Sequence, residues 1–568
     1  MPETFTEIKR TADATWNEWV NNGSPRIFVQ TNADSMASGA IEVKEAIQDT
    51  LDKQKISADV TVVGSQGMAF AEVVVDIIKP DKPRITYGNV TPENVPGLIV
   101  DYIVKDDPRP DLALGTQGEG EIDGIPLLKD HPFWKLQYPI VTRNFGHIEP
   151  GNLNHYIAQG GYSMLNRALE MEREDVRKEI ESSVLRGRGG ALFPAATKWN
   201  FMMNAPHPKY LAVNGEEGDA GAFTDKAIAE NDPHTLLEGI LISAYTMGID
   251  KSFVHIRAEY LVAVERLRRA VHELEEANLV GENILGTDFS TEIEIEATGH
   301  AYICGEETAL MDSVEGKRGT PRPRPPFPAA YGIFGRPTNI NNVKTLSYVP
   351  AIFEHGGEWF KSIGVEAATG TMFLSLSGDV KHSGFAEVPL GVSLREVVED
   401  MCGGTKSGTS FKGIQTGGPL GGGADWDSLK DLPLEFDPLN GLGAPVGSGG
   451  MMMLGQGTCI VDLTHNLMQF NAAESCGKCF PCRKGTGHIV RTINRVMTGL
   501  GKMEDLDEIV YMGDTMRDGS LCGLGQLAPR ITTAMLRHFR SEWESHLVDK
   551  TCPAGVCGNL DGQEITFS

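Results

Sequence analysis

Residues 210–225 read YLAVNGEEGDAGAFTD, a short apolar run that passes into a loop of polar side chains. The run 210–213 predicts a β-strand. Ligands of open α/β sheets bind beyond the carboxyl ends of the strands, so this loop is a candidate binding site. Its polar side chains are those of Asn214, Glu216, Glu217 and Asp219.

The region around this strand alternates short β runs with long amphipathic helices over residues 151–356. Further strands are expected at 253–256 and 293–295. After the first of these, apolar residues recur near helical spacing from Leu261 to Leu274. This alternation predicts a mainly parallel sheet with helices packed against it.

The length of 568 residues is too great for one core and predicts an α/β protein of several domains. Pattern changes along the chain suggest where these domains begin and end. We expect a small α/β domain at 1–115, a linker at 116–150, the α/β domain at 151–365, a β-grasp domain at 366–446, a helical bundle at 447–545 and a tail at 546–568.

The composition limits the classes of function and location. The net charge of −26 argues against nucleic-acid binding, because phosphates would repel this surface. No run of about 18 apolar residues occurs, so no direct membrane span is expected. The first twenty residues carry charges where a signal peptide needs an apolar stretch, which predicts a cytoplasmic protein. In that reducing compartment, clustered cysteines indicate metal or redox chemistry rather than disulfides.

The sequence ESCGKCFPC at 474–482 places three cysteines each three residues apart. Loops of this kind hold [4Fe–4S] clusters, which take four thiolates. The fourth is expected from Cys522, 40 residues beyond the last of the three. A structural zinc site is the alternative, although zinc usually has paired spacing. The predicted cluster ligands are Cys476, Cys479, Cys482 and Cys522.

A glycine-rich loop, RGRGGALFPAATKW at 186–199, precedes an expected helix. Such a loop lets backbone N–H groups approach a phosphate. It does not follow a strand as the dinucleotide fingerprint does, which disfavours a Rossmann site. By itself it could equally be a plain turn.

A second acidic loop, AYICGEETAL at 301–310, carries Tyr302, Glu306 and Glu307. Carboxylates beside a redox ring can hydrogen-bond its ribityl or nicotinamide groups, and their charge disfavours adding electrons to a flavin. Solvated loop charges are the alternative for either acidic loop taken alone. The two acidic loops together with the glycine loop favour a flavin site.

These motifs in this order resemble the NADH- and FMN-binding iron–sulfur flavoprotein subunit of respiratory complex I, NAD-linked formate dehydrogenases and electron-bifurcating hydrogenases. The resemblance covers residues from about 137 to 550. It implies hydride exchange between NAD(H) and FMN, and single-electron exchange with the cluster. It also implies a complex that contains a thioredoxin-like [2Fe–2S] subunit and further redox subunits.

The resemblance assigns site residues by motif. The implied FMN site comprises Gly187, Arg188, Gly189, Gly190, Lys198, Asn214, Glu216, Glu217, Tyr302, Gly305, Glu306, Glu307, Asn341 and Asn342. Glu217 and Glu307 are the implied catalytic carboxylates. The implied clamp on the NADH adenine is formed by Phe193, Phe201 and Phe327. Arg324 stands where relatives have lysine, and Asp219 stands where complex I has glutamate.

Two glycines of the family's loop are replaced here, by Leu192 and Ala196. Leucine at such a position could narrow the space beside the flavin or nicotinamide. The alternative function is therefore an electron-relay or scaffold subunit whose nucleotide site is degenerate.

The first domain is expected to be a thioredoxin-like relic without a cluster. Bifurcating relatives hold [2Fe–2S] there through two cysteine pairs. Gln30, Ser35, Ser65 and Ala69 stand at those positions, and none can supply a thiolate. A structural or docking role follows.

The tail contains CPAGVC, which resembles half of a zinc site. Similar cysteine and histidine positions recur in the bifurcating relatives that this chain resembles, where they are associated with zinc. The expected ligands are Cys459, His546, Cys552 and Cys557, with buried, unliganded thiols as the alternative. Cys304 and Cys402 are expected to be buried thiols without partners.

Overall fold

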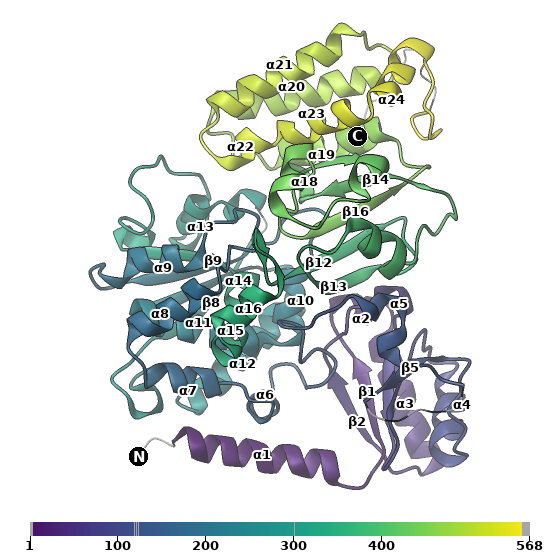
Figure 1. Ribbon diagram of the computed structural model, residues 1–568, viewed down its shortest axis with the longest axis vertical. Helices are drawn as coiled ribbons and strands as arrows, with labels where there is room; N and C mark the ends of the chain where they lie inside the picture. The colour runs from purple at the N-terminus through teal and green to yellow at the C-terminus, as the bar shows by residue number, and fades with distance from the viewer. Residues whose placement is uncertain are drawn as a thin grey trace.

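The computed structural model describes residues 4–118, 120, 122, 124–299, 301–558 and 560. Figure 1 shows the first sheet at one end, the helical bundle at the other, and two further sheets between them. This arrangement is a mixed α/β fold of several regions, as the sequence predicted.

The first region is a five-stranded sheet in the order β2-β1-β3-β4-β5. Its β1–β2 pair is parallel, and the other three pairs are antiparallel. Helix α3, Ala40–Gln54, places Val43, Ile47 and Leu51 in the core of this region. The strands are β1 Arg26–Gln30, β2 Asp59–Val63, β3 Val75–Ile78, β4 Arg84–Tyr87 and β5 Ala113–Gln117.

Helix α1, Phe5–Asn21, does not belong to the first core. Its Ile8 and Ala12 are buried in the core of the second region, where the helix packs against α6, Leu153–Ala158. The helix begins with a capping box formed by Thr4 and Glu7. Helix α1 therefore joins two regions that the expected boundary at 115 separates.

The second region contains a fully parallel sheet in the order β8-β7-β6-β9, as predicted. Its strands are β6 Tyr210–Gly215, β7 Lys251–Arg257, β8 Glu292–Thr298 and β9 Thr338–Asn342. Helix α11, Pro233–Met247, is buried around nearly its whole circumference. Helix α12, Leu261–Glu276, is amphipathic and buries the predicted apolar face from Val264 to Leu274, but Leu261 at its first position is 73% exposed.

The third region is a five-stranded sheet in the order β13-β12-β16-β14-β15. Its last strand in sequence, β16 Gly450–Gly455, lies beyond residue 446, where we expected this region to end. The expected boundary is wrong because the run MMML is a buried central strand between β12 and β14. The other strands are β12 Thr371–Gly378, β13 Gly384–Pro389, β14 Phe411–Thr416 and β15 Gly422–Asp425.

The fourth region is a helical bundle at the end of the chain (Figure 1). Its main helices are α19 Ile460–Ala473, α20 Phe480–Met497, α21 Glu504–Gly519 and α23 Pro529–His538. Helix α23 ends before Phe539, whose φ of −127° is not helical, and α24, Arg540–Glu544, follows. Among the described residues, no helix has both the length and the apolar character needed to cross a membrane.

Candidate functional site

The glycine loop and both acidic loops meet at the carboxyl end of the parallel sheet. Asn214, at the end of β6, donates from Nδ2 to the carbonyl of Gly305 over 2.8 Å. Asn342, at the end of β9, donates to the carbonyl of Asn214 over 3.2 Å. Hydrogen bonds between segments 91 and 128 residues apart thus fix the two strand ends and the second acidic loop around one site.

At two positions of the glycine loop, a side chain would cause either a steric clash or backbone strain. A Cβ on Gly189 would lie 2.9 Å from Cβ of Asn342, which is too close without movement of a neighbour. Gly190 has a φ of +100°, which L side chains rarely adopt. The backbone can therefore pass directly over the strand end, as binding of a phosphate by backbone N–H groups requires.

Glu216 is buried without a partner. Its side chain is 1% exposed, and within the described chain neither carboxyl oxygen has a hydrogen-bond partner. Burial raises the pKa of Glu216 to about 8, although Arg257 opposes the shift. Buried polar groups are normally satisfied, so two orphaned oxygens beside Gly305 suit a polar ligand such as the ribityl chain or ring of FMN.

Glu217 is satisfied in a different way. Its carboxylate accepts backbone N–H groups of Asp225 and Lys226, both at 2.7 Å, at the start of α10, Thr224–Asn231. Burial raises the pKa of Glu217 to about 7, with a further rise from Asp225 and an opposing effect of Lys344. Lys344 is fully buried and lies 3.0 Å from Asp225.

Asp225 and Lys344 belong to this site, and our sequence reasoning missed both. The available signal was a lysine two residues after Asn342 and an aspartate eight after Glu217. Buried charges need partners, so either residue predicted the other once burial was known.

The cationic residues of the glycine loop make different contacts. Arg188 is 1% exposed, and its guanidinium donates to the carbonyls of Thr369 and Thr371 at the start of the third region. Its predicted contribution to the FMN site is therefore limited to its backbone. Lys198 lies on α9, Ala195–Met203, and donates to the carbonyl of Ile340 over 2.9 Å.

Leu192 has a φ of +56°, a conformation that glycine adopts at lower cost than leucine. Its side chain packs against the core of the third region. That contact connects the loop to the core of the neighbouring sheet. Ala196 is buried in the core of the second region.

The predicted clamp residues are exposed aromatic side chains. Phe193, Phe201 and Phe327 are 43%, 56% and 59% exposed. Large exposed aromatic groups are available for stacking on a planar ligand. Arg324 forms an ion pair with Glu307.

The second acidic loop is also tied to the helical bundle. Glu306 caps α13, Glu307–Val314, by accepting N–H groups of Thr308 and Ala309. The backbone N–H of Tyr302 donates to Glu474 over 2.9 Å, and its ring packs edge-on against Phe470. Asn341 is buried and donates to Asn339.

The four predicted cluster cysteines gather at the base of the bundle. Cys479 is the residue before α20, and Cys522 is the residue before α22, Gly523–Leu527. Cys482 and Cys522 are buried in one apolar cluster, against which Cys476 and Cys479 pack. Burial raises the pKa of Cys482 to about 11, and the other three thiols add to this effect.

These four thiols fit a polynuclear cluster better than a single ion. Among the described residues, the only set of ligand atoms close enough for one ion lies elsewhere, in the tail. A [4Fe–4S] cluster needs four thiolates around a larger body. Cys304 is buried, as expected, and lies in the same apolar cluster. No spacing in the sequence indicated that it would lie near the four cluster cysteines.

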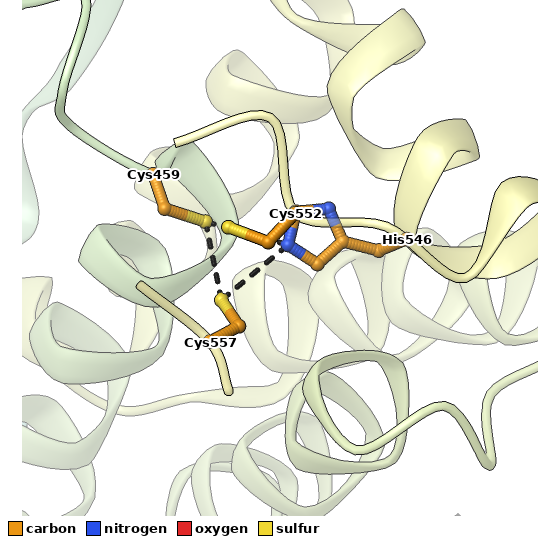
Figure 2. Close-up of side chains that lie close together, drawn as sticks. All are labelled: Cys459, His546, Cys552 and Cys557. Carbon is orange, nitrogen blue, oxygen red and sulfur yellow. Dashed lines mark hydrogen bonds between the residues drawn. The ribbon is translucent and has the colours of Figure 1, made fainter. Parts of the chain in front are cut away.

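Figure 2 shows the tail set, in which Cys459, His546, Cys552 and Cys557 point toward one another. Their ligand atoms all lie within 4.8 Å of one another. The Sγ of Cys459 is 3.5 Å from both His546 Nε2 and Cys557 Sγ. His546 Nδ1 is 2.8 Å from the carbonyl of Glu542, which directs Nε2 toward the thiols. Three sulfurs and one imidazole nitrogen match the ligand types of a structural zinc site.

Comparison with known proteins accounts for both the flavin and the cluster regions. Residues 180–351 match the family described as the Nuo51 FMN-binding domain, and residues 462–546 match the NADH-ubiquinone oxidoreductase-F iron-sulfur binding region. The NADP-reducing hydrogenase subunit HndC of Solidesulfovibrio fructosivorans is 41% identical over 427 residues, 75% of this chain and 87% of that protein. The F 2 subunit of the NADH-quinone oxidoreductase of Rhizobium meliloti (strain 1021) is 40% identical over 417 residues, 73% of this chain and 99% of that protein.

The chain belongs to the family of NADH-quinone oxidoreductase F subunits. As a member of this family it is an oxidoreductase subunit, with an FMN-binding domain and a [4Fe–4S] region. Its fold is that of a chain in the NAD⁺-reducing [NiFe]-hydrogenase in the H₂-reduced state, with a TM-score of 0.65, 24% identity, and coverage of 95% of this chain and 87% of that chain. The resemblance inferred from the motifs is confirmed.

Proposed function

We propose that this chain exchanges hydride between NAD(H) and FMN, and single electrons with a [4Fe–4S] cluster. It does so within a larger redox complex, as its relatives in the family are subunits of such complexes. When bound, FMN supplies the conversion between two-electron and one-electron transfer. The protein supplies binding, orientation and electrostatics.

The observation that carries the proposal is the unpartnered carboxyl of Glu216 where the three loops meet. The hydrogen bonds of Asn214 and Asn342 fix the strand ends, while Gly189 and Gly190 leave the backbone free to approach a phosphate. Glu216 then lies within this same site with both oxygens free for a ligand. The amides of α10 hold the carboxyl of Glu217 in place, and its charged form disfavours excess electron density on a nearby ring.

The nucleotide is proposed to lie along the exposed aromatic side chains of Phe193, Phe201 and Phe327. Arg324, paired with Glu307, is positioned to attract the phosphates of the dinucleotide. Leu192 packs on the third region, which removes the main support for a degenerate nucleotide site. The relay or scaffold function is therefore the less well supported of the two.

The proposed cluster ligands are Cys476, Cys479, Cys482 and Cys522. Cys482 and Cys522 share their apolar surroundings with Ile303 of the second acidic loop. The cluster would thus lie against the loop that bears Tyr302 and Glu306. Proximity of this kind favours direct electron exchange with the flavin site.

We also propose a zinc ion held by Cys459, His546, Cys552 and Cys557. The mutual approach of the four side chains supports it (Figure 2). The ion would join the start of α19 to the tail and so close the bundle.

The finer domain assignments remain proposals. The sheet order of the first region suits a thioredoxin-like domain without a cluster, and the five-stranded mixed sheet of the third region suits a β-grasp domain. A thioredoxin-like [2Fe–2S] subunit is the proposed partner, and the cytoplasm is the proposed location.

Anaerobic addition of NADH to the purified complex tests the proposed function. Bleaching of the flavin absorbance, with NADPH as the comparison nucleotide, is the expected result. A flavin that dithionite reduces but neither nucleotide reduces would contradict the proposal.

A further inference from the structure

Two loops of the first region carry Gln30, Ser35, Ser65 and Ala69 at the positions where relatives have cluster cysteines. Hydrogen bonds and an ion pair attach these loops to the second region. The backbone N–H of Ala33 donates to Glu230 over 3.0 Å, and that of Ser65 donates to Asn231 over 2.7 Å. Asp34 forms an ion pair with Lys226 at 3.0 Å. Glu230, Asn231 and Lys226 all lie on the eight-residue helix α10.

The same helix holds the carboxylate of Glu217. The N–H groups of Asp225 and Lys226 each donate to one of its oxygens, and the hydroxyl of Thr224 donates to the first over 3.1 Å. Lys226 thus contacts both sides: its backbone binds Glu217, and its side chain binds Asp34. A shift of α10 must displace the donors of Glu217.

We propose that the first region acts as a positioning element for the flavin site, holding α10 and thereby Glu217. The positioning residues are Asp34 of the first region and Lys226 of α10. The inference rests on the proposed place of Glu217 beside the flavin. It gives the cluster-free region a function other than electron transfer.

Several contacts support the attachment beyond the single ion pair. The guanidinium of Arg266 donates to the carbonyl of Thr31 over 3.0 Å and also to the carbonyl of Glu230 at the end of α10. A Cβ on Gly64 would lie 2.9 Å from Cβ of Asn231, so the loop and the helix are in close contact. Burial alone would lower the pKa of Lys226, but Glu230 and Asp34 outweigh it and keep the ammonium charged.

The first region is also held from its other side, which makes it a rigid support. The N–H of Phe385 on β13 donates to the carbonyl of Gly67 over 3.1 Å, and the N–H of Phe70 donates to Ser383 over 3.2 Å. The loop 64–70 is therefore fixed between α10 and the third region. A support fixed at both sides can transmit position to the helix.

The test uses the full chain in its purified complex with FMN bound. Asp34→Ala and Lys226→Met are compared with Asp49→Ala, which removes an exposed carboxylate paired with Lys53 on the far helix of the same region. We expect faster hydrogen exchange in a peptide covering 224–231, by about tenfold, in the first two variants only. We also expect KM for NADH to rise about threefold, since small displacement of a positioned group lowers activity.

A cycle with Glu217→Gln separates positioning from general loosening. If Asp34 acts through Glu217, Asp34→Ala should have little further effect on KM or on the flavin reduction potential in the Glu217→Gln background. Equal effects in both backgrounds, or unchanged exchange of 224–231, would overturn the inference. Hydrogen exchange and mediated potential titration do not use NADH, so failure of the proposed function would appear separately, as a wild-type flavin that NADH does not reduce.

Discussion

The hydroxyl of Tyr302 donates to Oδ1 of Asp219 over 2.5 Å and so joins the two acidic loops directly. The other oxygen of Asp219 accepts the hydroxyl of Ser448 from the third region over 2.7 Å. A Cβ on Gly418 would lie 2.6 Å from Cγ of Asp219, so the third region closes tightly over this carboxylate. Asp219 therefore joins the flavin-binding region to its neighbour.

Tyr302→Phe should destabilise this junction. A hydrogen bond to a charged group contributes about 1.5–3 kcal/mol, and its loss leaves Asp219 with one donor fewer. We expect a lower midpoint of thermal unfolding and a higher KM for NADH, with FMN content retained. Tyr511→Phe, on an exposed side chain of α21, is the matched control. Equal behaviour of the two variants would argue against the junction.

The cluster assignment predicts a sharp difference among buried cysteines. Cys522→Ser should abolish or strongly alter the EPR signal of the reduced [4Fe–4S] cluster while FMN stays bound, because a hydroxyl replaces a thiolate ligand. Cys402→Ser, in the core of the third region, should leave the signal unchanged. Cys304→Ser is the closer control, since Cys304 shares the apolar cluster of Cys522. A normal signal in Cys522→Ser would refute the ligand set.

Local patterns predicted the elements that depend on neighbouring residues. The parallel strands and the amphipathic face of α12 follow from periodicity, and the cluster cysteines from spacing. The strand β16 was missed because Met452 and its neighbours lie among glycines, where no alternation appears. Its place between two other strands is decided by long-range pairing.

The site was predicted less completely than the fold. Motifs named Glu217, but its donors on α10 and the buried pair of Asp225 and Lys344 depend on packing between distant segments. Arg188 was assigned to the FMN site because it lies within the motif. Its guanidinium instead donates to the carbonyls of Thr369 and Thr371. Spacing along the chain cannot show which way a long side chain turns.

The aromatic clamp can be tested with two equally exposed phenylalanines. Phe327→Ala should raise KM for NADH by about tenfold, since loss of one stacking contact to a base costs about 1–3 kcal/mol. Phe334 is 58% exposed, against 59% for Phe327, but packs edge-on against Tyr210 and Phe253. Phe334→Ala should therefore leave KM within about twofold of the wild type. An unchanged KM in Phe327→Ala would show that the adenine binds elsewhere.

Glu216 predicts a pH dependence of stability in the FMN-free chain. Burial raises its pKa from 4.5 to about 8, so between these values the folded chain binds a proton that the unfolded chain does not. The contribution of Glu216 to the free energy of unfolding should then be fully present below about pH 4.5 and be lost as pH rises toward 8, by at most about 1.4 kcal/mol per unit. Glu216→Gln should reduce this slope, measured by denaturant unfolding at several pH values. Glu217, with a pKa raised to about 7, should retain part of it.

Glu275→Gln is the control for that measurement, because its carboxylate is 61% exposed on α12. It should leave the slope unchanged. If Glu216→Gln and Glu275→Gln give the same pH profile, the carboxyl of Glu216 is charged in the folded chain and the orphaned oxygens need another explanation.

The zinc proposal predicts that metal and tail order are lost together. Cys557 lies 3.4 Å from His546 and 3.5 Å from Cys459, so its removal leaves three ligands and an open position. Cys557→Ala should lower zinc from one per chain toward none, measured by elemental analysis, and should increase proteolysis after residue 546. FMN and cluster content should not change, because the cluster cysteines lie at the start of α20 whereas the tail packs near its end, and the flavin loops lie apart from the tail (Figure 1). Cys402→Ala removes an equally buried thiol from another core and should retain the zinc.

Structural zinc binds with about 10–16 kcal/mol in small domains, so a real site should also make tail proteolysis sensitive to chelator in the wild type alone. Stoichiometric zinc in Cys557→Ala would count against these four ligands.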